Sequence, residues 1–160
     1  MKRFILICAL TWPLASWAGL DEGIAAYTVG DYPKALVEFQ ALADQGDMQG
    51  QYFVGFFYHN GFGVKTSQVE AVKWFSKAAE QGDPRSQYYV GIIYATGKGI
   101  AKDLPKADLW LTLSATNPKT SYRDSLYTKE EIAKIEKKMT PEQIAEVKDL
   151  VGKWKPQAQN

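Results

Sequence analysis

The strongest constraint on the fold is an internal repeat with a period of 36 residues. When residues 31–66 are placed over residues 67–102, 13 of the 36 positions carry the same residue, in one register and without a gap. The matches fall in both halves of the unit. A period of this length is typical of proteins in which each repeat is one supersecondary unit that buries its apolar face against the next. We therefore expect a stack of units with a continuous core.

Each unit is predicted to be a pair of helices followed by a glycine turn. In the first helix apolar residues recur at steps of three and four, which is the period of one buried stripe: Ala71, Phe75, Ala78 and Ala79. Ser67 with Glu70 predicts a capping box at its start, and Gly82 predicts a left-handed end. The second helix, about 83–96, is apolar nearly all the way round and is expected to lie between other helices.

A glycine recurs inside the second helix of both full units, as Gly55 and Gly91. Glycine in a helix interior costs about 1 kcal/mol relative to alanine, so its repetition indicates a packing requirement. We expect two helix backbones to approach closely there, with the small Ala43 or Ala79 opposite the glycine.

Capping helices are predicted at both ends of the array, because the terminal units of a solenoid would otherwise expose their stacking faces to water. Residues 20–29 are expected to form a short helix at the first end. At the other end the third unit is partial, 103–118, and capping helices are expected within 119–154. One of these is predicted to begin near Thr128 and one near Thr140, where a Thr is followed three residues later by Glu or Gln.

The repeat resembles the Sel-1-like repeat (SLR) family, which is related to tetratricopeptide repeats. The resemblance rests on the pattern Ala71-x-x-Trp74-Phe75-x-x-Ala78-Ala79-x-x-Gly82-Asp83, followed by Gln87-Tyr88-x-x-Gly91-x-x-Tyr94-x-x-Gly97-x-Gly99-Ile100. It implies an all-α fold, a short right-handed α-solenoid of antiparallel helix pairs. It also implies a concave side that binds proteins or peptides, and scaffolding more often than catalysis.

Residues 1–18 have the pattern of a secretory signal peptide. A short basic start precedes an almost wholly apolar stretch, and small residues stand at the two positions that a signal peptidase reads. Cleavage is expected between Ala18 and Gly19, which leaves a single domain at 19–160 in the periplasm or outside the cell. The apolar stretch, about 15 residues with Pro13 inside it, is shorter than the roughly 20 that span a bilayer, so we expect a cleaved leader and not an uncleaved anchor helix. We also expect no membrane insertion of the mature chain.

Composition argues against most chemical function classes. The chain has 19 Lys+Arg against 18 Asp+Glu, a formal net charge of +1, and so no basic excess that would favour nucleic acid. It has one His and one Cys, and Cys8 lies inside the predicted signal peptide. His59 stands where the next unit has Ala95 and is expected to be a solvated residue at a helix end. We therefore expect no metal site, no cofactor and no enzyme activity.

The predicted interaction surface is the row of first helices, because in tetratricopeptide-like arrays these line the inner face. Glu38, Lys73 and Lys77 lie outside the buried stripe of these helices, and the two lysines are placed to meet an acidic partner. Phe62, in the first turn between units, is a candidate aromatic contact. Two alternatives stay open: the lysines are only solvated, and Phe62 folds back on its own turn.

The leading prediction is an exported, monomeric, non-enzymatic module that binds a protein or peptide as a scaffold or adaptor of the bacterial envelope. An immunity or inhibitor protein against a secreted effector is the alternative. An enzyme that acts on β-lactams or peptidoglycan is a remote one, because the mature chain contains no Ser-x-x-Lys motif.

Overall fold

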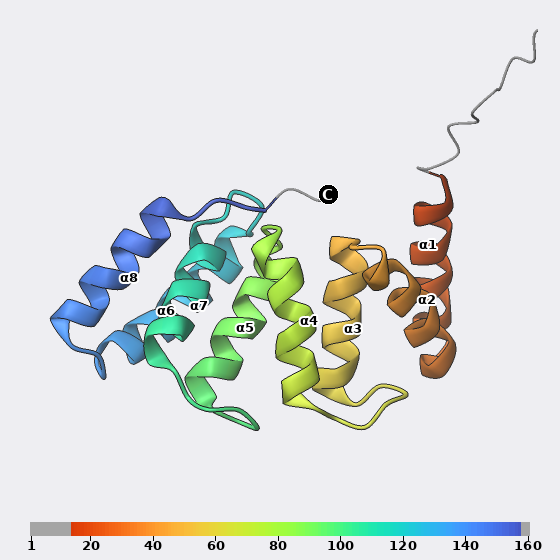
Figure 1. Cartoon of the computed structure of the whole chain (residues 1–160), viewed down its shortest axis with the longest axis horizontal. Coiled ribbons are helices and arrows are strands. Elements are labelled where there is room, and N and C mark those ends of the chain that lie inside the picture. The colour runs from red at the N-terminus through yellow and green to blue at the C-terminus, as the bar shows by residue number, and fades with distance from the viewer. Residues whose placement is uncertain (1–13, 158–160) are drawn as a thin grey trace, which may run out of the picture.

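The computed structural model describes residues 14–157, which fold into eight helices and contain no strand. The helices are α1 (Leu14–Thr28), α2 (Tyr32–Asp44), α3 (Met48–Asn60), α4 (Gln68–Glu80), α5 (Pro84–Thr96), α6 (Leu104–Thr116), α7 (Tyr122–Glu136) and α8 (Pro141–Lys153). Each of α1 to α6 packs on the helix that follows it, and α8 packs on α6, which produces an elongated row (Figure 1). The predicted all-α solenoid of helix pairs is confirmed.

The N-terminal helix is longer than the predicted segment 20–29. The helix α1 spans the bond at which cleavage is predicted, between Ala18 and Gly19. Residues 1–13, the larger part of the predicted signal peptide, lie outside the described residues. In the described part of the chain, no helix has the length and apolarity needed to cross a membrane.

Helices α2 to α8 all begin in the same way, after a residue whose side chain accepts a hydrogen bond from the backbone N–H three positions on. These N-cap residues are Asp31, Asp47, Ser67, Asp83, Asp103, Ser121 and Thr140. The predicted helix start at Thr140 is confirmed, with a complete capping box. The short polar caps therefore place most helix boundaries where the sequence predicts them.

The capping box predicted at Ser67 forms only by half. Ser67 Oγ accepts from the Glu70 N–H at 3.3 Å, but the Ser67 N–H donates to the Tyr58 carbonyl at 2.9 Å. The Glu70 carboxylate therefore finds no donor at the cap, and it lies 3.5 Å from Lys73 Nζ instead.

The predicted helix start at Thr128 is wrong. Helix α7 begins at Tyr122, after the N-cap Ser121, and Thr128 lies inside it. Its side chain is buried, and Thr128 Oγ1 donates to the Asp124 carbonyl at 2.7 Å. A threonine hydroxyl that bonds the carbonyl four residues back is compatible with the helix interior, so the Thr-x-x-Glu pattern was not a reliable start signal here.

The glycines inside α3 and α5 each receive a large side chain from the following helix. A Cβ at Gly55 would lie 2.7 Å from Phe75 Cδ1, and a Cβ at Gly91 would lie 2.5 Å from Leu111 Cγ. Phe75 and Leu111 are fully buried and occupy equivalent positions of the repeat, since 111 − 75 = 36. The glycine therefore creates the space that the next helix fills.

The prediction that Ala43 or Ala79 lies opposite these glycines is wrong. The small residue that contacts Ala43 closely is Gly50, because a Cβ there would lie 2.6 Å from the Ala43 nitrogen. The same kind of contact occurs in the first unit. There Phe39, one period before Phe75, lies against Gly23 of α1. At Gly55 and Gly91 the nearest atoms belong to a large side chain of the next helix, and at Gly91 the backbone carbonyl of Ala107 also lies close, 3.1 Å from the added Cβ.

The turns between paired helices are joined by amide side chains along one edge of the row. Gln81 Nε2 donates to the Gly46 carbonyl at 3.0 Å, and Asn117 Nδ2 donates to the Gly82 carbonyl at 3.1 Å. Both donors and both acceptors are one period apart, since 117 − 81 = 36 and 82 − 46 = 36. Successive units are therefore held at a fixed distance by equivalent hydrogen bonds.

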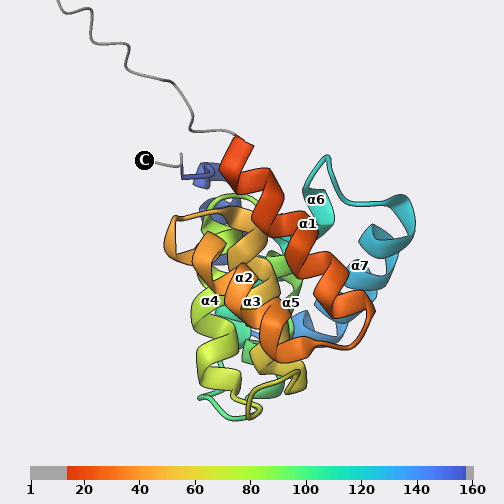
Figure 2. The same cartoon turned by 90° about the vertical axis from the view of Figure 1, so that its right-hand side faces the viewer.

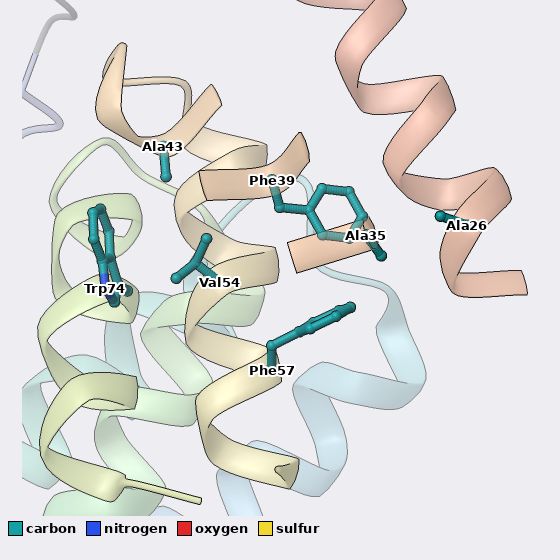
Figure 3. Packing of buried hydrophobic residues seen from close by; sticks show 7 residues of the cluster. All are labelled: Ala26, Ala35, Phe39, Ala43, Val54, Phe57 and Trp74. Atoms are coloured by element: carbon teal, nitrogen blue, oxygen red, sulfur yellow. The ribbon is translucent and has the colours of Figure 1, made fainter. Parts of the chain in front are cut away.

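The core is a series of apolar clusters along the row. The first is built by α1 to α4 around Phe39, Val54 and Phe57, with Ala26 and Trp74 at its two sides (Figure 3). Two further clusters follow between α4 and α5 and between α6 and α7. Full burial of one large apolar side chain stabilises a fold by about 1.5–3 kcal/mol, so each junction between units contributes to stability.

We predict that Gly91→Leu strongly destabilises the protein, because the new side chain would overlap Leu111 and approach the Ala107 carbonyl. Overpacking of this kind typically costs about 1–3 kcal/mol or more. Gly152→Leu is the matched control, since Gly152 lies in α8 with no atom within 4 Å of its added Cβ. Thermal unfolding measures both, and a Gly91→Leu midpoint within a few degrees of wild type would contradict the packing.

Candidate functional site

A groove with a volume of about 500 Å³ lies between α3, α5 and α7. Four tyrosines contribute to its wall: Tyr52 from α3, Tyr88 and Tyr89 from α5, and Tyr127 from α7. Two of them are equivalent positions of the repeat, because 88 − 52 = 36. The periodic stacking of the units therefore places aromatic rings side by side along the groove.

The tyrosine rings form a continuous run across three helices. Their centroids are 6.3 Å apart for Tyr52 and Tyr89, 5.8 Å for Tyr89 and Tyr88, and 6.3 Å for Tyr88 and Tyr127. The planes are inclined by 46°, 74° and 49°, so adjacent rings form notches and not one flat wall. Tyr89 is held from behind by Phe75, on which it stacks at 4.7 Å.

A cation lies over the first ring of this run. The guanidinium carbon of Arg85 is 3.9 Å from the Tyr52 ring centroid, and Arg85 Nε donates to Asp83 Oδ1 at 3.2 Å. Asp83 Oδ2 accepts from the backbone N–H and the hydroxyl of Ser86. Among the described residues, the two terminal nitrogens of Arg85 make no hydrogen bond. The side chain is 47% exposed, so these nitrogens are available to a ligand.

Burial raises the pKa of two groove phenols. The pKa of Tyr52 is raised to about 12, mainly by desolvation and then by the nearby Tyr89 phenol. The pKa of Tyr88 is also raised to about 12, again mainly by desolvation and then by Tyr127. Both phenols are protonated near neutral pH, as an ordinary tyrosine is, and the Tyr88 hydroxyl already interacts with the side chain of Tyr127.

The charged residues proposed from the sequence lie on the other row of helices. Glu38 is on α2, and Lys73 and Lys77 are on α4, which Figure 2 shows on the side of α5 opposite α7. Lys73 Nζ lies 3.5 Å from a carboxylate oxygen of Glu70. Lys77 Nζ lies 3.9 Å from the Trp74 ring centroid. The structure does not bring these residues to the groove.

Phe62 is half-buried in an aromatic cluster near the start of the row. Its ring stacks on Tyr32 at 4.7 Å and meets the rings of Tyr27 and Phe57 edge-on, with centroids 5.8 Å away in each case. Its role in the described structure is therefore to join the turn after α3 to α1 and α2.

His59 is not the solvated residue expected from the sequence. It is half-buried, with Nδ1 2.9 Å from Gln68 Oε1 and its ring 5.2 Å from the Tyr89 centroid. These contacts tie the end of α3 to the start of α4 and support the groove from behind. The part of the chain that the structure describes contains no group of three or more His, Cys, Asp and Glu side chains placed to hold a metal ion.

Comparison with protein families assigns the repeat. The Sel1 repeat model matches residues 49–83 and residues 84–118. The chain therefore contains two Sel1 repeats. No curated protein sequence matches it significantly.

Two solved structures are similar to this Sel1 repeat chain. One is a protective antigen present in uropathogenic Escherichia coli strains that displays an SLR fold, with 28% identity and a TM-score of 0.77. The match covers 87% of this chain but only 29% of the antigen. The other, a Sel1 repeat protein from Oxalobacter formigenes, has 24% identity and a TM-score of 0.57 over 73% of this chain and 54% of that one. The present chain thus spans under two thirds of either structure.

The family comparison also changes which helix is the first helix of each repeat. The repeats 49–83 and 84–118 begin in α3 and α5, one helix later than the units 31–66 and 67–102 used for the sequence prediction. With this phase, the first helices are those that line the tyrosine groove. The sequence feature that indicates the tyrosine groove is the repeated Gln-Tyr pair, which ends at Tyr52 in one unit and at Tyr88 in the next.

We predict that the two raised phenol pKa values make stability fall in alkaline solution. The pKa values are about 12 in the folded protein against 10.0 without the fold, so ionisation opposes folding. The contribution is complete below pH 10 and is lost as the pH rises from 10 through 12. Chemical denaturation across this range should show a smaller decline for Tyr88→Phe than for wild type. Identical declines would contradict the assignment.

Proposed function

We propose that this chain is a non-enzymatic scaffold or adaptor of the bacterial envelope, which binds a segment of another protein in the groove between α3, α5 and α7. Sel1 repeat proteins are generally protein–protein interaction modules, and their fold is typically a non-enzymatic scaffold. The observation that carries the proposal is the run of four tyrosine rings with Arg85 beside it.

The residue types of the groove fit a binding surface. Tyrosine and arginine are enriched among the residues that dominate binding energy, because each offers a large apolar area and a polar end. The groove volume, about 500 Å³, lies in the range of ordinary ligand pockets and is sufficient for a short peptide segment. The rings of Tyr52 and Tyr89 are held by packing on Phe75, so they lose little conformational entropy when a ligand binds.

Export to the envelope is the second part of the proposal. Its support is the sequence pattern of residues 1–18 and the place of the groove, which is built entirely from residues after Gly19. The α1 residues Gly23 and Ala26, which pack in the first cluster, also follow the predicted cleavage bond. Removal of the leader would therefore retain both the groove and this cluster.

We predict that groove variants lose peptide binding and that variants of α4 do not. Peptides selected from a random display library on the chain 19–160 should bind Tyr127→Ala and Arg85→Ala at least about tenfold more weakly, a loss of about 1.4 kcal/mol. Titration calorimetry measures the dissociation constants.

The matched controls are Tyr122→Ala, which removes an 80% exposed ring of α7 outside the groove lining, and Lys73→Ala with Lys77→Ala. These variants should bind the selected peptides as wild type does. A loss of affinity confined to the lysine variants would move the binding surface to α4 and overturn the proposal.

We predict that the full chain, expressed in a bacterial host with an intact secretion pathway, is recovered from the periplasm or medium with Gly19 as its first residue. Intact mass spectrometry and cell fractionation measure this outcome. In the variant Ala18→Glu a charge replaces a small residue that the peptidase reads, so processing should fail. Wild-type protein that keeps residues 1–18 and stays in the cytoplasm would refute export.

A further inference from the structure

We propose that the tyrosine groove takes a proline-rich segment in the polyproline II conformation. This inference rests on the proposed function and names the ligand class of the same groove. It is carried by the shape of the groove, the inclination of its rings and the hydrogen-bond donors that it offers.

The groove, about 500 Å³, has room for a short peptide segment. The described residues contain no strand, so they offer no sheet edge to which a peptide could add. Four residues of polyproline II span only about 12 Å.

The ring geometry matches proline side chains. Adjacent planes in the run from Tyr52 to Tyr127 are inclined by 46° to 74°, which leaves notches between neighbouring rings. Proline-rich segments dock in grooves lined by aromatic rings, and their rigid conformation lowers the entropy lost on binding. Successive notches between the tyrosine rings can therefore receive the proline rings that recur along a polyproline helix.

The hydrogen-bonding groups of the groove complement a backbone that accepts but does not donate. Proline has no N–H, and polyproline II leaves its carbonyls without internal partners. On the protein side, the phenol of Tyr52 and the terminal nitrogens of Arg85 are donors, and Lys119 adds an ammonium group. Of the two oxygens of Asp124, the carboxylate that lines the groove, one already accepts from the Ser121 hydroxyl at 2.6 Å.

Fluorescence anisotropy with labelled octaproline tests this inference on the chain 19–160. A glycine–serine peptide of the same length tests for nonspecific adhesion, and octaglutamate tests for attraction by Arg85 and Lys119 alone. We expect saturable binding of octaproline and at least about tenfold weaker binding of the other two peptides. Binding of octaglutamate in place of octaproline would overturn the inference in favour of an acidic ligand.

Two variants of one helix separate the groove from the rest of the surface. Tyr127→Ala should weaken octaproline binding at least about tenfold, while Tyr122→Ala should leave it unchanged. Both residues are exposed, by 54% and 80%, so neither substitution should prevent folding, which circular dichroism verifies. Tyr88→Phe keeps the ring and removes only its hydroxyl, so it should cause a smaller loss than Tyr127→Ala. Equal losses for Tyr127→Ala and Tyr122→Ala would also overturn the inference.

The two proposals fail in different ways. If octaproline does not bind while display-selected peptides without proline bind wild type and lose affinity for Tyr127→Ala, the ligand class is wrong and the binding function stands. If neither octaproline nor any selected peptide depends on Tyr127, both proposals are wrong.

Discussion

The contact between a glycine of one helix and a large side chain of the next determines how the whole row is built. Phe75 lies against Gly55, and one period later Leu111 lies against Gly91. Any side chain at these glycines would push α4 away from α3, or α6 away from α5, because interiors at native density have no spare room. The repeated cost of glycine in a helix is thus offset by burial of a large residue at the junction.

The groove is a consequence of this spacing. Equal junctions place Tyr52 and Tyr88 one period apart on neighbouring helices, and α7 adds Tyr127 at the next position along the row. The ring of Tyr89 stacks on Phe75, the same side chain that lies against Gly55, so one residue serves both the junction and the groove. A change in the junction should therefore alter the distances between the tyrosine rings as well as the stability.

Local signals in the sequence predict the helices better than they predict the contacts between them. The caps Asp83 and Thr140 act within one turn, so the starts of α5 and α8 follow from a few residues. The residue that packs against Gly91 is set by the position of α6 relative to α5, and no local sequence pattern determines that position. Helix α7 lacks the repeat pattern, so its start at Tyr122 and the contribution of Tyr127 to the groove were missed.

The central claim is that the face of α3, α5 and α7 binds ligand and that the face of α2 and α4 does not. The most direct measurement is a map of amide chemical shifts in isotope-labelled protein titrated with octaproline. We expect the shifts to concentrate at Arg85, Tyr88 and Tyr127 and to leave α2 and α4 unchanged. Shifts concentrated around Lys73 and Lys77, with the groove residues unaffected, would contradict the claim.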